Sequence, residues 1–344
     1  MNLETRKEAF VKCGLFIKRH FNGNWEENEK SLHEGLNQLI ATALTYNGWF
    51  IKDFVEKSIQ NIASMLEEKS LSDFCKNIPE PKQPKTVAII MAGNIPMVGF
   101  HDLMCVLLSG HKALIKLSSD DNVLLPFFIK LLAHYQPGIA ENIKFSQAKL
   151  ADFDAVIATG SNNTASYFKY YFGKYPHIIR KNRTSVAVIT GKESVEDLKK
   201  LGDDIFTYFG LGCRNVSKLL VPKGYVLDPI FEAGFDYKFV VDNKKYGNNY
   251  DYNRAVYILN LEKFLDNNFL IIKEDKGLFS PVSVLLYQEF ESEKEIKQYL
   301  SDNKEDLQCI VGNGPGYVPF GYSQQPVISE YADGVDTLKF LVNL

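Results

Sequence analysis

After residue 85 the chain alternates between short apolar runs and helical segments, and this alternation constrains the fold more than any other feature. Residues 86–91, 113–117 and 155–158 are largely apolar runs typical of buried strands, and each is followed by a turn and a segment of helical periodicity. Three strand–turn–helix repeats predict a parallel sheet covered by helices. A second α/β unit follows, with strands predicted at 185–189, 218–221, 282–286 and 308–311 and a helix from about 195 to 208.

The rest of the chain is organised around these two α/β units. Apolar residues recur at spacings of three and four up to about residue 65, which predicts a helical N-terminal segment over residues 1–78. A Pro-rich connector, 78–85, separates that segment from the first strand, because Pro fixes φ and lacks a backbone donor. We predict domains over 1–184 and 185–325 and a C-terminal tail over 326–344 that packs back on the chain or forms an interface. Residues 337–342 are suited to an edge strand in such an interface, or to packing on their own chain.

Charge and cysteine content limit the environment and the partners. The chain has 39 basic and 42 acidic residues, and this balance argues against binding to nucleic acid or to an anionic membrane. Its 5 cysteines include no CxxC pair, which argues against a disulfide framework and for a reducing compartment. The N-terminus is polar, and no apolar run approaches the roughly 18 residues of a membrane span. We therefore expect a cytoplasmic protein without a signal peptide or membrane span.

Cys213 is the leading candidate for a reactive group. It lies in the run Gly210-Leu211-Gly212-Cys213-Arg214-Asn215, directly after a predicted helix. A thiol between a glycine and a basic residue is poorly placed for core packing. The same position suits a nucleophile presented at the end of an element.

Three loops that end predicted strands carry polar groups, and ligands of parallel sheets bind beyond the carboxyl ends of the strands. Asn94, in a loop that contains Gly93 and Pro96, is either an oxyanion donor or the centre of an Asx turn. The run 159–164 either binds a phosphate or caps a helix. Lys116, which precedes Ser118 and Ser119, either contacts a ribose or phosphate or is solvated.

Other motifs in the chain do not predict a metal site or a dinucleotide-binding loop. His101 and Cys105 lie four residues apart on a predicted helix, but no further ligand is near in the sequence, and we predict no metal site. Residues 312–316 imitate a dinucleotide-binding loop, yet Pro315 and Pro319 block the helix that such a loop must open. No GxGxxG motif opens a helix, and no GxSxG motif is present.

In their order and spacing, these features resemble the aldehyde dehydrogenase superfamily, whose cofactor domain lacks GxGxxG. The matching positions are Asn94 with Pro96, Lys116, Gly160-Ser161, and Gly210 with Cys213. Within the superfamily the chain resembles the fatty acyl-CoA reductases of bacterial bioluminescence, in residues 179–185, 212–216 and 331–338. The resemblance runs from about residue 86 to the end of the chain.

The resemblance implies an α/β, aldehyde dehydrogenase-like fold with two Rossmann-like three-layer αβα domains, cofactor-binding over 1–184 and catalytic over 185–325. It also implies a mechanism. The Cys213 thiolate attacks the thioester of an acyl-CoA, CoA leaves, and a nicotinamide cofactor reduces the new thioester to an aldehyde. Asn94 and the Cys213 N–H stabilise the oxyanion. The cofactor-contact positions are Lys116, Ser118, Ser119, Thr159, Gly160 and Ser161.

The chain departs from the superfamily pattern at three positions. Arg180 replaces the glutamate base of the hydrolytic members, which favours reduction of the acyl-enzyme over its hydrolysis. Gly277 replaces a glutamate that contacts the nicotinamide ribose, so this role is not carried over. Ser119 replaces the acidic residue of NAD-preferring members, which favours NADPH, although NADH stays open because Asp120 and Asp121 are close by.

Basic residues at the predicted domain junction allow a further hypothesis. Arg180 and Arg183, with His177 and Lys181, either bind the phosphates of CoA or cofactor or belong to a solvated loop with at most structural ion pairs. We predict reduction of a long-chain acyl-CoA by a homo-oligomer. The alternatives are a reductase of another activated acyl group, such as an acyl phosphate, and a non-reducing subunit that binds or carries an acyl group. The partners that we expect are a fatty acyl-CoA or another acyl thioester, and an acyl-activating partner protein.

Overall fold

The computed structural model describes residues 1–147 and 149–344, which form two compact units. Unit 1 comprises residues 1–181 and 327–344, and unit 2 comprises residues 182–326. The end of unit 1 at Lys181 is close to the boundary after residue 184 that the sequence predicts. No helix in the described part of the chain is long and apolar enough to cross a membrane.

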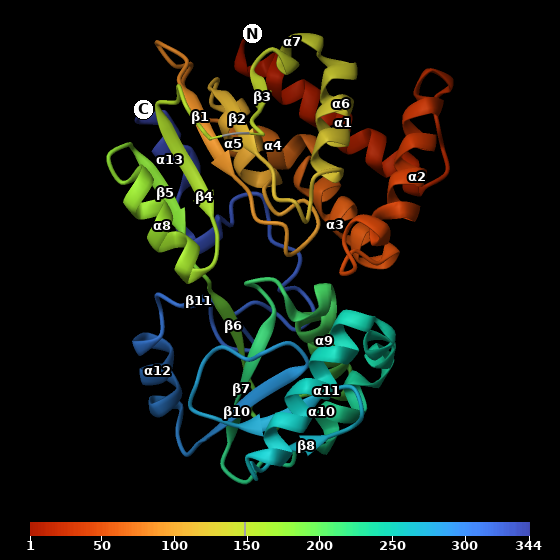
Figure 1. The fold of residues 1–344 in the computed structure, drawn as a ribbon, viewed down its shortest axis with the longest axis vertical. Helices are drawn as coiled ribbons and strands as arrows, with labels where there is room; N and C mark the ends of the chain where they lie inside the picture. The colour runs from red at the N-terminus through yellow and green to blue at the C-terminus, as the bar shows by residue number, and fades with distance from the viewer. Residues whose placement is uncertain (148) are drawn as a thin grey trace. The chain divides into compact units, whose positions relative to one another are not determined.

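Unit 1 combines an N-terminal group of helices with a five-stranded sheet (Figure 1). Its elements are α1 (Leu3–Phe21), η1 (Glu27–Glu29), α2 (Lys30–Tyr46), α3 (Lys52–Met65), α4 (Glu68–Cys75), β1 (Thr86–Ile90), α5 (Phe100–Leu108), β2 (Lys112–Lys116), α6 (Leu124–Tyr135), α7 (Pro137–Ala140), β3 (Ile143–Phe145), β4 (Ala155–Thr159), α8 (Asn162–Phe172), β5 (His177–Arg180), η4 (Ala332–Gly334) and α13 (Thr337–Val342).

The sheet of unit 1 is parallel, with the strand order β3-β2-β1-β4-β5. β2 and β4 pair with opposite edges of β1, so the chain changes direction across the sheet between β1 and β4. In open α/β sheets such a switch point leaves a crevice at the carboxyl ends of the strands. The loops after β1 and β4 therefore lie where a ligand is expected.

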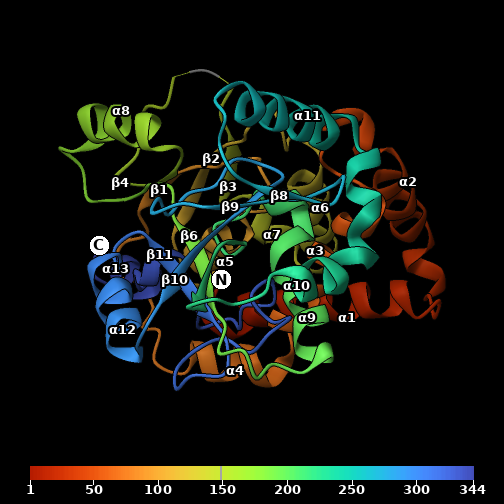
Figure 2. The ribbon, with the colours of Figure 1, turned by 90° about the horizontal axis from the view of Figure 1, so that it is seen from below.

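Both faces of this sheet are buried, as its almost continuous apolar strands require. Val87 and Ile89 of β1 pack in a cluster that includes residues of α1, α5 and α6. Ala88 packs on the opposite face, in a cluster with Phe168 and Phe172 of α8. Figure 2 shows α8 on one side of the sheet and α5 on the other.

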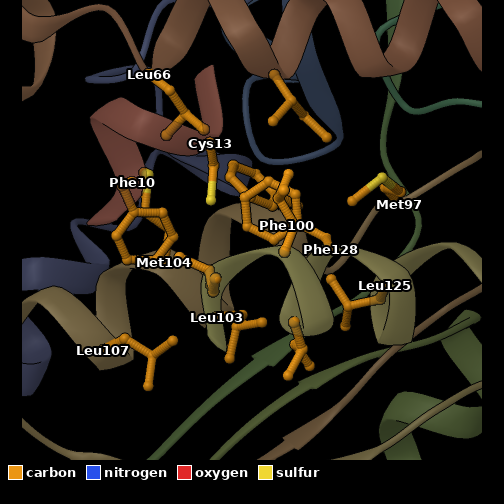
Figure 3. Close-up of a cluster of buried hydrophobic side chains, with 14 of the residues drawn as sticks. Phe10, Cys13, Leu66, Met97, Phe100, Leu103, Met104, Leu107, Leu125 and Phe128 are labelled. Atoms are coloured by element: carbon orange, nitrogen blue, oxygen red, sulfur yellow. The ribbon is translucent and has the colours of Figure 1, made fainter. Parts of the chain in front are cut away.

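The core of unit 1 joins the N-terminal helices to the sheet layer. Figure 3 shows α1 and α5 contributing residues to one apolar cluster, with Phe10 close to Phe100 and Phe128. The rings of Phe100 and Phe128 meet edge to face at 4.8 Å between centroids, and Phe10 stacks on Phe128 at 6.3 Å. The helical N-terminus is thus packed into the core of unit 1.

The C-terminal tail packs on unit 1. His101 Nε2 is 2.7 Å from the carbonyl oxygen of Ile328, and His111 Nε2 is 3.0 Å from that of Leu341. The suggested edge strand at 337–342 is wrong, because these residues form α13, which packs against α5. Asp336 caps this helix by accepting a hydrogen bond from the Lys339 N–H at 2.9 Å.

Unit 2 is built on a second sheet, with the strand order β11-β6-β7-β10-β9-β8. Its pairs are parallel except for β8 with β9. Its elements are β6 (Thr184–Val188), α9 (Val195–Phe206), η2 (Thr207–Gly210), β7 (Val216–Pro222), α10 (Asp228–Ala233), η3 (Gly234–Asp242), α11 (Lys244–Leu259), β8 (Leu265–Asp266), β9 (Ile271–Glu274), β10 (Val284–Phe290), α12 (Glu293–Asp302) and β11 (Leu307–Val311).

The pairing of unit 2 is irregular at two neighbouring places. The register between β6 and β7 shifts between Ser185 and Val186. The register between β11 and β6 shifts between Leu307 and Ile310. Both shifts lie near the amino ends of these strands. The loop that contains Cys213 leads into the amino end of β7, on the same side of the sheet.

Candidate active site

The loop of Cys213 connects α9 to β7 through an unusual backbone. Tyr208, Phe209 and Gly210 follow one another with φ of 55°, 58° and 76°. This region is unfavourable for residues with a Cβ, at a cost of about 1–2 kcal/mol per residue. Tyr208 and Phe209 are buried, so packing holds the backbone in this conformation. Gly210 continues the turn without that penalty, and the chain reaches Cys213 in a defined direction.

Asn215 ties this loop to the end of α9. Its side chain is buried, and its Oδ1 accepts a hydrogen bond from the Gly212 N–H at 2.8 Å. Its Nδ2 contacts the carbonyl oxygens of Asp204, Ile205 and Thr207 at 3.1, 3.3 and 2.8 Å. These carbonyls lie at the C-terminal end of α9, where no following helical turn supplies backbone N–H groups to bind them.

The peptide groups on both sides of Cys213 are fixed. The Asn215 N–H donates to the Gly212 carbonyl at 3.0 Å. In a planar trans peptide the N–H points away from the C=O, so this bond also directs the Cys213 N–H. On the other side, the Ser185 hydroxyl donates to the Cys213 carbonyl at 3.0 Å. The half-buried Cys213 thiol is therefore presented from a rigid loop.

A buried carboxylate holds the segment 321–323 beside the end of α9. The Asp204 carboxylate accepts hydrogen bonds from the Gly321 N–H at 2.7 Å and the Ser323 N–H at 2.9 Å. Burial raises the pKa of Asp204 to about 6. The Arg214 Nε donates to the carbonyl of Ser323, so the residue after Cys213 binds the same segment.

In unit 1, the loops after β1 and β2 pack on each other. A Cβ on Gly93 would lie 2.7 Å from the Ser118 Oγ, so only glycine allows this approach. The side chain of Asn47 donates to the carbonyls of Gly93 and Asp120 at 3.3 and 3.1 Å. Asn94 is exposed at the tip of the first of these loops. This packing brings Asn94 and Ser118 to the same end of the sheet.

Asp121 adds a second connection between these loops. Its Oδ2 accepts a hydrogen bond from the Met97 N–H at 2.7 Å, and burial raises its pKa to about 6. Lys116 and Ser119 are exposed near the end of β2. Asp121 therefore faces the interior of unit 1, whereas Ser119 and Asp120 face solvent.

The loop after β4 caps α8. The Ser161 Oγ accepts a hydrogen bond from the Thr164 N–H at 3.3 Å, so Ser161 is the N-cap. A Cβ on Gly160 would lie 2.9 Å from the Thr164 Cγ2, which requires glycine there. Thr159 is the last residue of β4. The run 159–164 therefore caps a helix, as one of its two interpretations predicted. Phosphate binding by the same loop stays a prediction.

Arg180 lies buried in strand β5, so this position is not in a solvated loop, but the structural ion pair that the same interpretation allowed is present. Its guanidinium forms a buried ion pair with Asp102 of α5, in which Nη2 is 2.9 Å from Oδ1 and Nη1 binds Oδ2. Nη2 also donates to the Thr337 Oγ1 at 3.1 Å. Arg183 belongs to unit 2 and donates through Nη1 to the Leu307 carbonyl at 3.0 Å. A role of either arginine in CoA binding stays a prediction.

A buried lysine fixes the loop that contains Gly277. The Lys218 Nζ donates to the carbonyls of Asp275 and Gly277, both at 2.9 Å, and to the Gln288 Oε1 at 2.8 Å. Lys218 is fully buried, and burial lowers its pKa to about 8. The loop at Gly277 is therefore held by a side chain from the strand that follows Cys213.

The structure gathers the predicted residues into two groups. Asn94, Lys116, Ser118, Ser119, Thr159, Gly160 and Ser161 lie at the carboxyl ends of β1, β2 and β4 in unit 1, and Cys213 lies before β7 in unit 2. No role was predicted from the sequence for Asn47, Ser185, Asn215 or Lys218. Ser185 and Lys218 carry a usable signal, because each is a polar residue within an apolar strand.

Comparisons with known proteins agree with this architecture. An aldehyde dehydrogenase from Physcomitrella patens, solved with succinate, has a TM-score of 0.67 at 12% identity, covering 100% of this chain and 84% of that chain. A putative aldehyde dehydrogenase from Burkholderia cenocepacia has a TM-score of 0.65 at 13% identity, with coverages of 90% and 74%. One from Bacillus cereus, solved with NAD+, has a TM-score of 0.63 at 13% identity, with coverages of 90% and 72%.

These similarities confirm the predicted aldehyde dehydrogenase-like α/β fold. No curated protein matches the sequence. The acyl-CoA reductase family LuxC matches residues 18–229, which is more than half of the chain and includes both Asn94 and Cys213. This result confirms the resemblance that the motifs indicated, and the chain belongs to the LuxC family of acyl-CoA reductases.

Proposed function

We propose that this protein reduces a long-chain fatty acyl-CoA to the fatty aldehyde with NADPH, through a thioester on Cys213. The observation that carries the proposal is the rigid Cys213 loop, in which Asn215 and Ser185 fix the flanking peptide groups while the thiol stays half-buried. A structural cysteine in a core needs no such support. Membership of an acyl-CoA reductase family points to the same class of reaction.

In this mechanism the Cys213 thiolate attacks the thioester carbonyl carbon. The new C–S bond forms as the bond to CoA breaks, and CoA leaves as a thiolate that takes up a proton. The Asn94 amide and the Cys213 N–H donate to the oxyanion, which in comparable sites stabilises the transition state by about 3 kcal/mol per donor. After reduction, the hemithioacetal oxyanion on Cys213 collapses, its C–S bond breaks, and the aldehyde and the Cys213 thiolate are released.

Unit 1 has features that fit a nicotinamide dinucleotide. Its sheet has a switch point between β1 and β4, and Gly93 and Gly160 stand where a Cβ would collide with a neighbouring side chain. Two of the similar structures are complexes with NAD+. We expect Lys116, Ser118, Ser119, Thr159, Gly160 and Ser161 to hold the cofactor. When bound, NADPH supplies the hydride for the acyl carbon.

Two observations support NADPH as the reductant and aldehyde as the product. The first is that Asp121 is buried and bonded to the Met97 N–H, so that of the two carboxylates after Ser119 only that of Asp120 is exposed to a 2′-phosphate. Arg180, at the position of the hydrolytic glutamate, is permanently protonated and cannot activate water. Its pairing with Asp102 further excludes it from that role.

Intact-mass measurement tests the proposal. Incubation with palmitoyl-CoA should add one palmitoyl group to the wild type and none to the Cys213→Ala variant. NADPH should then remove the group and release palmitaldehyde. An acyl group that survives NADPH favours the carrier alternative, and acylation by palmitoyl phosphate alone favours the acyl phosphate alternative. Equal acylation of Cys213→Ala would disprove the cysteine mechanism.

Arg183 and Arg180 are both proposed CoA contacts, and Arg183 is the one tested by substitution. If its guanidinium binds a CoA phosphate, Arg183→Ala should raise the KM for palmitoyl-CoA and leave the KM for NADPH unchanged. An unchanged KM for palmitoyl-CoA would remove this role.

A further inference from the structure

We propose that Ser185 and Cys309 form a hydroxyl–thiol pair that positions the Cys213 loop, and that Cys309 acts on Cys213 through the Ser185 side chain. The proposal depends on the proposed function only in taking Cys213 as the reactive thiol. Ser185 and Cys309 are positioning residues in this scheme, because neither is assigned a contact with substrate.

The hydrogen bonds of Ser185 define the pair. Its hydroxyl donates to the Cys213 carbonyl at 3.0 Å. Its Oγ accepts from the Cys309 N–H at 3.2 Å and lies 3.1 Å from the Cys309 Sγ. Ser185 is fully buried, so water does not compete for these bonds.

The chemistry of a hydroxyl assigns the donors. A serine hydroxyl has one hydrogen and two acceptor lone pairs. Because its hydrogen is used for the Cys213 carbonyl, the contact with Cys309 requires the thiol S–H to donate. The Cys309 N–H and S–H thus occupy both lone pairs of Ser185 and direct its hydrogen toward the loop. Removal of the thiol frees the hydroxyl to rotate.

The irregular strand pairing supports a specific role for these two positions. The register of β6 against β7 shifts at Ser185, and that of β11 against β6 shifts within the stretch that contains Cys309. β-Bulges, which produce register shifts of this kind, re-aim side chains and are over-represented beside active sites.

A double-mutant cycle tests the coupling without any substrate. The variants are Ser185→Ala, Cys309→Ala, their combination, and Cys309→Ser, with Ile310→Val as a matched control in the same strand. The readout is the rate of Cys213 alkylation by iodoacetamide, from the mass of its peptide. Cys13, Cys75 and Cys105 are buried, and burial raises the pKa of each thiol, so they should react slowly.

We expect each single alanine variant to slow Cys213 alkylation by about fivefold, as the loss of one buried hydrogen bond implies. The double variant should be no slower than Ser185→Ala alone, because in this scheme Cys309 acts on the loop through Ser185. Cys309→Ser retains a donor and should restore most of the rate. Additive effects of the two alanine variants, or no effect of either, would overturn the proposal.

Steady-state kinetics with palmitoyl-CoA and NADPH provide a second readout. Positioning of the nucleophile predicts a lower kcat with an unchanged KM for palmitoyl-CoA, whereas general loosening of unit 2 would also lower the melting temperature. If Ser185→Ala fails to fold, the comparison of Cys309→Ala with Cys309→Ser still decides the matter. Normal alkylation of Cys213 without any acylation would contradict the proposed function and leave this inference intact.

Discussion

Asn215 holds Gly212 from both sides, since its side-chain oxygen accepts from the Gly212 N–H at 2.8 Å and its own N–H donates to the Gly212 carbonyl at 3.0 Å. The Asn215 amide nitrogen meanwhile binds three carbonyls at the end of α9. One side chain therefore joins a helix terminus to the residue before the proposed nucleophile. This arrangement lets the packing of α9 determine the position of Cys213.

Asn215→Ala should lower both stability and acylation. The substitution leaves the Gly212 N–H and the carbonyls of α9 buried without this partner, which should reduce the free energy of unfolding by about 2–3 kcal/mol. Urea denaturation measures this loss, and intact mass follows the rate of acylation by palmitoyl-CoA. Asn313→Ala, an exposed asparagine of unit 2, should change neither. A fully stable Asn215→Ala variant would show that the network is unimportant.

Arg180→Met should destabilise unit 1. The substitution leaves the buried Asp102 carboxylate without its cation, and breaking such a pair costs about 3–5 kcal/mol. In urea denaturation, Arg180→Met combined with Asp102→Leu should be more stable than Arg180→Met alone, because both charges are then gone. Equal losses in the single and double variants would contradict the coupling.

Lys218 should make stability depend on pH in the alkaline range. Burial lowers its folded-state pKa to about 8 from an ordinary 10.5, so the folded protein disfavours the charged form. The free energy of unfolding is therefore highest above pH 10.5, where Lys218 is neutral in both states. It decreases as the pH falls toward 8, because the unfolded chain takes up a proton that the folded protein disfavours.

Urea denaturation between these two pH values tests the effect. The free energy of unfolding of the wild type, minus that of Lys218→Met, should fall by about 3 kcal/mol as the pH decreases across this range. Lys294→Met, at an exposed position of α12, serves as the control and should show no such trend. A difference independent of pH would mean that the ammonium group is well solvated in the folded state.

Ser119→Glu should shift the cofactor preference away from NADPH. A carboxylate at this position would repel the 2′-phosphate and raise the KM for NADPH by about tenfold, with little effect on the KM for NADH. Initial rates with each cofactor at saturating palmitoyl-CoA measure the change. Equal changes for both cofactors would place Ser119 away from the 2′-position.

The main strands and helices were predictable because each carries its own local signal. Residues 87–90 are apolar throughout, and this pattern indicated a strand buried on both faces, as β1 is. The short strands β3 and β8 lacked such a signal, with 3 and 2 residues respectively. β5 was misinterpreted because its charged ends, His177 and Arg180, suggested a solvated loop.

By itself, the sequence determined the alternation of strands and helices and the family. It also identified Asn94 and Cys213 as candidate catalytic residues. These properties follow from local periodicity and from motifs in a fixed order. Only the tertiary structure decided the partners of the buried polar groups. Arg180 pairs with Asp102 across 78 residues, and Ser185 meets Cys309 across 124 residues. Such hydrogen bonds form between segments that folding brings together, so they leave no periodic trace in the chain. The presence of Cys213 is thus a property of the sequence, and the support of its loop by Asn215, Ser185 and Cys309 is a property of the fold.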